Sequence, residues 1–141
     1  MRKRQPEITA AELRVLKALW KLENATVRDV KELLDAEGGK SSAYTTVMTL
    51  LNQLAAKDVL AVDRARQPFV YSPKVRREEV LGHRLRQFLQ SVFDGQGGEL
   101  VLRLIDEVQL SPEEIRRLEA KIDALDPSLP GSADEQTEDG K

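Results

Sequence analysis

The residues best suited to binding chemistry lie on one side of a helix predicted over residues 43–57, with Ser41 and Ser42 as its N-terminal caps. Apolar residues three and four positions apart form the other, buried side. The polar side carries hydroxyl and amide groups where ordinary exposed helix faces carry Glu and Lys. Such groups are typical of a helix that reads DNA bases, although a solvated face with several threonines would show the same pattern. This polar side consists of Tyr44, Thr45, Thr46, Thr49, Asn52 and Gln53.

A basic hairpin is predicted directly after this helix. Two β-rich runs, at 59–62 and 69–71, flank a turn that contains Arg64 and Arg66. The arginines can lie over phosphates or enter a minor groove, and their alternative role is to keep an exposed hairpin soluble. Helix and hairpin together predict a DNA-binding surface, to which the basic N-terminal arm at residues 2–4 adds phosphate contacts. The predicted DNA-binding residues are Lys40, Ser42, Ala43, Tyr44, Thr45, Thr46, Thr49, Lys57, Arg64 and Arg66.

Two shorter helices are expected before the polar-faced helix, and both have start signals. Thr9 and Glu12 form a capping box at the first start, and Thr26 with Asp29 marks the second. The order helix, helix, helix, hairpin within residues 9–73 is that of a winged helix-turn-helix.

Three further helices are predicted over 76–93, 99–108 and 111–125, separated from one another by glycine-rich or polar turns. The last begins with Ser111 as N-cap and Pro112 at its first position. We therefore predict a mostly α fold with a small β-hairpin, comprising an N-terminal winged helix-turn-helix and a C-terminal three-helix dimerisation region.

The apolar stripes of these three helices are too wide for so short a segment to bury by itself. A second copy of the chain, related by twofold symmetry, would cover them. The alternative is that they fold back on the N-terminal half of a monomer. The predicted interface residues are Leu81, Leu85, Phe88, Leu89, Val92, Leu100, Leu104, Ile105, Val108, Ile115, Leu118 and Ile122.

The distribution of charge also separates the N-terminal part of the chain from the C-terminal part. The net charge is −2, yet residues 1–77 carry 15 Lys and Arg against 9 Asp and Glu. Residues 78–125 carry 6 basic against 10 acidic side chains, and residues 126–141 carry 1 against 5. A basic half joined to an acidic one indicates a polyanion-binding unit. We predict a DNA-binding domain over 1–75, a dimerisation domain over 76–125 and a disordered acidic tail over 126–141.

Catalysis is not expected. The chain has no cysteine, which excludes disulfides, thiolate metal sites and a cysteine nucleophile. His83 is the only histidine, and no serine or carboxylate lies at a spacing that indicates a triad. Gly95, Gly97 and Gly98 match neither a phosphate loop nor a dinucleotide fingerprint. We expect no metal and no cofactor. With no apolar run long enough to span a bilayer, we also expect no membrane insertion and a cytoplasmic protein.

The polar-faced helix, with the run Ala-Tyr-Thr-Thr-Val at 43–47, and the Val-Tyr-Ser-Pro run at 70–73 resemble the BlaI/MecI family of penicillinase and methicillin-resistance repressors. The resemblance covers about residues 7–125 and extends to the Ile-Thr-Ala-Ala-Glu-Leu start at 8–13. It implies a bacterial repressor that binds an inverted-repeat operator in double-stranded DNA as a homodimer. A second hypothesis is a winged helix that docks a protein while the acidic tail shields it.

Departures from the family pattern predict local differences. Gln53 stands where many relatives have Arg, which removes one phosphate contact, and Asp58 stands where they have Gly, which predicts loss of a helix C-cap. The resemblance also implies a membrane sensor or protease system as a partner. In β-lactam-responsive relatives an Asn–Phe bond in the fifth helix is cleaved, and the matching residues here are Arg103 and Leu104.

Overall fold

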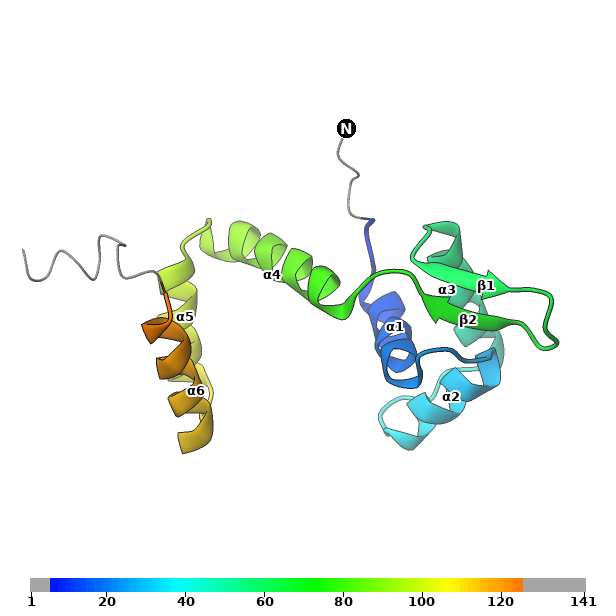
Figure 1. Ribbon diagram of the computed structural model, residues 1–141, viewed down its shortest axis with the longest axis horizontal. Helices are drawn as coiled ribbons and strands as arrows, with labels where there is room; N and C mark the ends of the chain where they lie inside the picture. Colours follow the sequence, from blue (N-terminus) through cyan, green and yellow to red (C-terminus); the bar gives the residue numbers. More distant parts are fainter. Residues whose placement is uncertain (1–5, 126–141) are drawn as a thin grey trace, which may run out of the picture. The chain divides into compact units, whose positions relative to one another are not determined.

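The computed structural model describes residues 6–125, and the chain divides into two compact units between Phe88 and Leu89. The first unit contains three helices, a two-stranded hairpin and most of a fourth helix (Figure 1). The second contains the end of that helix and two more. The predicted mostly helical fold with one hairpin is thus confirmed over the described residues. The predicted basic arm at 2–4 and acidic tail at 126–141 lie outside them.

Three helices, α1 (Ala10–Leu22), α2 (Val27–Ala36) and α3 (Tyr44–Ala56), pack against one another in the first unit. Apolar residues at three- and four-residue spacing point inward from each helix, as the periodicity predicts. Because each helix buries one stripe in a common core, the remaining face of α3 is left for solvent. The fully buried apolar side chains include Leu16, Leu19, Val30, Val47, Leu51 and Leu54.

The predicted N-caps of the first two helices are present, and both form capping boxes. Thr9 Oγ1 accepts from the Glu12 backbone N–H at 3.1 Å, and Glu12 Oε1 accepts from the Thr9 N–H at 3.0 Å. Thr26 and Asp29 exchange the same two bonds, each at 3.1 Å. Each pair satisfies two N–H groups that have no partner within the helix, so α1 and α2 begin where the sequence predicts.

The predicted serine caps of α3 are wrong. The N-cap is Ala43, which makes no side-chain capping bond. Ser41 Oγ donates to Asp35 Oδ1 at 3.1 Å, and Ser42 Oγ lies 3.5 Å from Arg14 Nη1. Serine hydroxyls bond readily to nearby polar groups. Here both hydroxyls bond to side chains of α1 and α2 and therefore do not cap α3.

The predicted loss of the C-cap at Asp58 is also wrong. Asp58 adopts a φ of 67°, and the Val59 N–H donates to the Leu54 carbonyl at 2.9 Å. This bond is the one that closes a Schellman cap, in which glycine is the commonest residue at the left-handed position. Aspartate tolerates that conformation better than most side chains, and its carboxylate accepts from Lys74 Nζ at 2.5 Å.

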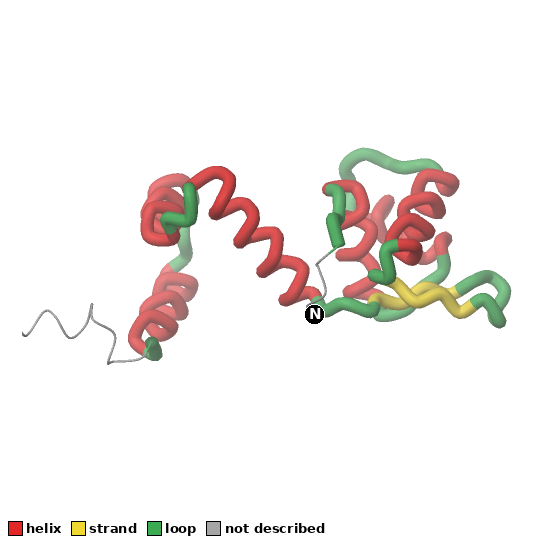
Figure 2. The backbone as a smooth tube through the Cα atoms, turned by 90° about the horizontal axis from the view of Figure 1, so that it is seen from above, coloured by secondary structure: helices red, strands yellow, loops and turns green. Residues whose placement is uncertain are grey.

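The hairpin consists of β1 (Leu60–Asp63) and β2 (Val70–Pro73), which pair antiparallel. It lies along one side of the three helices (Figure 2). Tyr71 anchors it to the turn between α1 and α2, because its N–H and carbonyl exchange bonds of 2.8 and 2.9 Å with Ala25. The element order and this hairpin make the first unit a winged helix-turn-helix.

The fourth helix, α4 (Arg77–Phe93), starts within the first unit. Val80 is buried in its core, and Trp20 Nε1 donates to the carbonyl of Val75 just before the helix at 3.1 Å. Arg84 donates to the Ile8 carbonyl from the second turn of the helix. The compact unit therefore includes the first turns of α4.

The other two helices are α5 (Gly97–Glu107) and α6 (Pro112–Asp123). The Ser111 capping box is present as predicted, with Glu114 as its partner. The predicted start of α5 at residue 99 is wrong, because the left-handed turn is completed earlier, at Gly95, and Gln96 then serves as N-cap. Neither helix contains a buried residue.

Candidate nucleic-acid interface

The polar side of α3 is exposed over its first turns. Thr45, Thr46 and Thr49 are exposed, and Tyr44 is 44% exposed beside them. On the opposite side Val47, Leu51 and Leu54 are fully buried, so the core holds α3 at a fixed rotation. Side chains with donors and acceptors therefore project from a rigid helix, which is the arrangement that major-groove reading requires.

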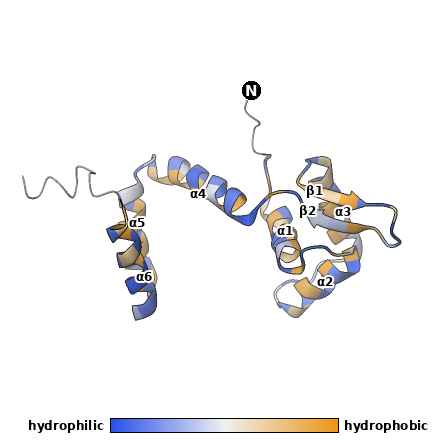
Figure 3. Ribbon diagram, in the orientation of Figure 1, coloured by the Kyte–Doolittle hydropathy of each residue, from blue (hydrophilic) through white to orange (hydrophobic). Residues whose placement is uncertain are grey.

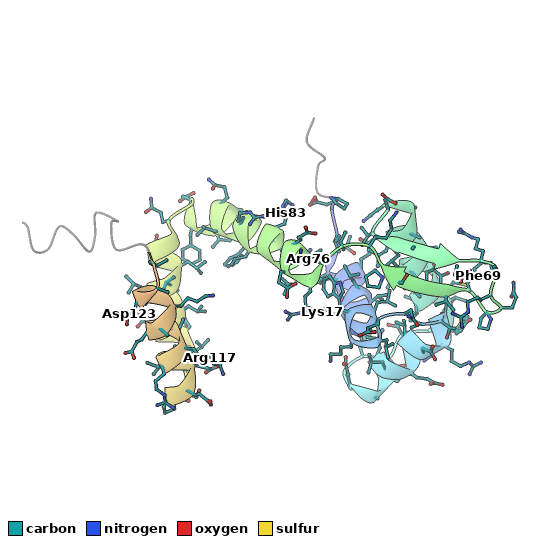
Figure 4. All side chains as sticks on the ribbon, viewed as in Figure 1. Lys17, Phe69, Arg76, His83, Arg117 and Asp123 are labelled. Atoms are coloured by element: carbon teal, nitrogen blue, oxygen red, sulfur yellow. The ribbon has the colours of Figure 1, made fainter. Side chains whose placement is uncertain are left out.

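The hairpin places basic side chains next to this helix. Arg64 and Arg66 are exposed in the turn between β1 and β2. The guanidinium carbon of Arg64 lies 5.7 Å from the ring centroid of Phe69, so a cation–π contact directs it back over the hairpin. Figure 4 places Phe69 at the hairpin end of the unit and Lys17 on α1, away from it. Arg66 is thus the more available of the two arginines.

A hydrogen bond between α3 and β2 fixes the hairpin against the helix. Tyr71 Oη donates to Asn52 Oδ1 at 2.9 Å, and both residues line a groove together with Met48 and Leu60. The Tyr71 phenol is a donor at neutral pH, and burial raises its pKa further. The sequence placed Asn52 on the DNA-reading side, whereas the structure gives its amide this positioning bond.

The turn between α2 and α3 brings Lys40 and Ser42 next to the start of α3, as predicted, but with an unpredicted partner. Arg14 of α1 donates from Nη2 to the Lys40 carbonyl at 3.1 Å. Ser41 joins the turn to Asp35 of α2, and a hydrogen bond from Lys31 is the main cause that lowers the pKa of the Asp35 carboxyl. No spacing rule would have found Arg14, because the two bonded residues are 26 positions apart.

Lys57 is held inside the unit. Its Nζ donates to the Glu12 carboxylate and to the Glu7 carbonyl, each at 2.6 Å. Glu12 is the one charged side chain that is buried among the described residues, at 2% exposed. Burial raises the pKa of Glu12, but the bonds from Lys57 and Thr9 outweigh this and lower the pKa below its ordinary value. The predicted phosphate-binding lysine thus compensates a buried carboxylate.

The residues predicted for an interface between two copies are unevenly covered. Leu81, Leu89 and Leu100 are half-buried, whereas the other nine are exposed. Figure 3 shows the apolar positions in orange along α5 and α6. A mostly apolar pocket lies along α6, and its lining includes Leu110, Leu118, Arg117 and Lys121.

Other site types are not apparent in the part of the chain that the structure describes. No three His, Cys, Asp or Glu side chains converge there as metal ligands. Within residues 6–125, none of the helices has the length and apolar character needed to cross a bilayer.

Comparison with known proteins gives consistent results. The family described as "Penicillinase repressor" matches residues 8–124. The penicillinase repressor of Bacillus licheniformis is 32% identical over 82% of this chain and 89% of its own length. The methicillin resistance regulatory protein MecI of Staphylococcus aureus is 25% identical over 79% of this chain and 89% of its own length. A solved structure concerning regulation of DNA binding of BpsR from Bordetella bronchiseptica aligns with a TM-score of 0.42 at 20% identity, covering 84% of this chain and 75% of that one.

The family match spans nearly all of the described residues, and its first relative exceeds 30% identity across most of both chains. These relatives are repressors and not enzymes, in agreement with the catalytic groups that the sequence lacks. The exposed face of α3 and the adjacent basic hairpin are the parts of the fold suited to nucleic acid. The chain therefore belongs to the penicillinase repressor family of transcriptional repressors and is a DNA-binding regulator.

Proposed function

We propose that the protein is a homodimeric repressor that binds an inverted-repeat operator and blocks transcription by occupying the promoter. The exposed hydroxyl face of α3 beside the basic hairpin carries this proposal. Tyr44, Thr45, Thr46 and Thr49 read base edges in the major groove. Lys40, Arg64 and Arg66 bind phosphates and supply most of the affinity. Lys57 is left out of this set because its ammonium is bonded within the fold.

The exposed apolar residues of α4–α6 support dimerisation. Twelve large apolar side chains between Leu85 and Leu125 are 42–67% exposed, far more than a stable soluble monomer normally leaves in contact with water. A second copy brings an identical set, and a twofold interface pairs it with the first. Two winged helices related by that axis would meet two half-sites of opposite direction, which is the symmetry of an inverted repeat.

The proposal is tested by fluorescence anisotropy with a fragment from upstream of the protein's own gene and random competitor DNA. Three basic contacts per copy give a slope of log K against log salt of about −5, so affinity falls about 10³-fold between about 50 and 200 mM salt. Saturation at one dimer per site that survives competitor is expected. Binding that competitor abolishes, at every salt concentration, would favour the protein-docking hypothesis.

Replacing Arg66 with alanine tests the hairpin contact. Each dimer loses two phosphate contacts, so the salt slope becomes shallower by about 1.8 while the preference among DNA sequences is unchanged. Lys17→Ala removes the same charge from α1 and serves as the matched control. An unchanged slope in Arg66→Ala would remove the hairpin from the interface.

Release from DNA by a sensor or protease system stays a prediction. The Arg103–Leu104 bond lies inside α5, with the Arg103 side chain 60% exposed and within 3.7 Å of Glu107. A protease would need to unwind this helix before it could cut there.

A cytoplasmic location also stays a prediction.

A further inference from the structure

We infer that Arg14 is a positioning residue for base reading, because it clamps the turn that sets where α3 begins. The inference rests on the proposed function, since it concerns how the α3 face is held for DNA. Arg14 itself lies on α1 and outside the predicted DNA-binding set. Its contacts, the backbone of the turn and the missing cap of α3 together assign this role.

The turn before α3 contains two glycines and no side-chain cap for the helix that follows. Gly38 and Gly39 both have positive φ, of 86° and 80°, and a Cβ at either position would meet nothing within 4 Å. The N-cap Ala43 contributes no side-chain bond either, so no cap of its own fixes the start of α3 before the buried Val47. The residues that lead into α3 are instead held by side chains of α1 and α2.

Arg14 supplies that anchor from α1. Its Nη2 donates to the Lys40 carbonyl at 3.1 Å, and its Nη1 lies 3.5 Å from Ser42 Oγ, the outer limit of a hydrogen bond. One planar guanidinium therefore spans the residues on both sides of Ser41. The donors of a lysine ammonium all lie on one nitrogen at the end of a flexible side chain. Lysine therefore cannot hold two separated acceptors as the planar guanidinium does.

A second set of contacts ties the same turn to α2. Ser41 Oγ donates to Asp35 Oδ1 at 3.1 Å, and Lys31 Nζ lies 2.8 Å from Asp35 Oδ2. The bond between Ser41 and Asp35 joins residues six positions apart, whereas the Arg14 bridge joins the turn to α1, 26 positions away. α1 also packs directly on α3. Because Arg14 lies on α1, its bonds fix the position of the turn relative to both helices.

This arrangement affects base reading more than phosphate attraction. Lys40, Ser42 and Tyr44 follow one another from the turn into α3, so a shift of the turn displaces all three relative to the groove. Small displacements are costly for directional bonds to bases and cheap for attraction between charges. Two of the guanidinium donors of Arg14 are directed to the turn, so we infer that Arg14 acts through the geometry of these bonds.

The experiment compares Arg14→Ala, Arg14→Lys and the control Lys17→Ala with the wild type. The probes are a duplex that the wild-type protein selects from a random-sequence pool and a scrambled duplex of equal length. Affinity for both is measured by anisotropy at two salt concentrations, and thermal unfolding confirms that each variant is folded. Lys17 lies one helical turn from Arg14 and is exposed, so its replacement matches the loss of charge.

Both Arg14 variants are expected to lose about tenfold in affinity for the selected duplex, as when one base contact is misaligned. For the scrambled duplex, the affinity and salt slope of Arg14→Ala are expected to equal those of Lys17→Ala, and those of Arg14→Lys are expected to equal the wild-type values. Full retention of selectivity in Arg14→Ala would overturn the inference alone. A parallel loss on both duplexes with a shallower slope would overturn it too, because Arg14 would then be a phosphate contact. A wild type that selects no sequence would contradict the proposed function and the inference with it.

Discussion

Replacing Lys57 with methionine is expected to lower the free energy of unfolding of the first unit by about 3 kcal/mol at pH 7. The substitution leaves the Glu12 carboxylate buried at 2% exposure without its cationic partner. Removing one member of such a pair costs more than the pair contributes, because the remaining charge stays out of water. Trp20 is the only tryptophan and belongs to this unit, so its fluorescence during urea unfolding reports the change.

The loss should depend on pH in a defined direction. In the wild type the pKa of Glu12 is below its ordinary value of 4.5, so its charged form stabilises the fold above about that pH. This contribution disappears as pH falls through the folded-state pKa, and the difference between wild type and Lys57→Met shrinks with it. Lys21→Met is the control, because its ion pair with Glu37 is exposed and contributes less than about 1 kcal/mol. Equal effects of the two substitutions would show that Glu12 is not the cause.

Replacing Leu118 with glutamate is expected to convert the proposed dimer into a monomer. Leu118 is 44% exposed at the centre of α6 and lines its apolar pocket, so a charge there would be buried against the second copy. A monomer binds one half-site at a time, and the lost linkage between half-sites lowers operator affinity about 10²- to 10⁴-fold. Analytical ultracentrifugation and anisotropy measure the two effects on the same sample.

Arg116→Gln is the matched control for this substitution. Arg116 is exposed two residues away, on the far side of α6, and its loss also changes the net charge by one unit. It should leave both the mass and the operator affinity unchanged. A Leu118→Glu protein that stays dimeric would place the interface elsewhere.

The helix starts and the buried helix faces could be predicted from the sequence, because the contacts that determine them join residues close together in the chain. The capping boxes of Thr9 and Thr26 join residues three positions apart, so they are visible in the sequence and present in the structure. The same holds for the buried side of α3, which follows from helical periodicity. Asp58 shows a limit, because the backbone bonds of the cap form even without the preferred glycine.

Contacts between side chains that are far apart in the sequence could not be predicted from local patterns. Lys57 and Glu12 are 45 positions apart, and nothing in the spacing of either distinguishes an internal ion pair from a phosphate contact. Arg14 and the turn before α3, and Tyr71 with Asn52, are further pairs that only the packed fold brings together. Each became evident once the positions of the helices were known.

The central claim is that α3 reads bases in two symmetry-related half-sites. The most direct measurement compares the sequences that the wild type and Thr45→Val select from a random DNA pool. Valine keeps the shape of Thr45 and removes its hydroxyl, so the fold and the phosphate contacts stay unchanged. The wild type should select an inverted repeat, and Thr45→Val should relax the preference at one position in each half-site, by about 1 kcal/mol. Identical selected sequences for the two proteins, or selection without an inverted repeat, would contradict the claim.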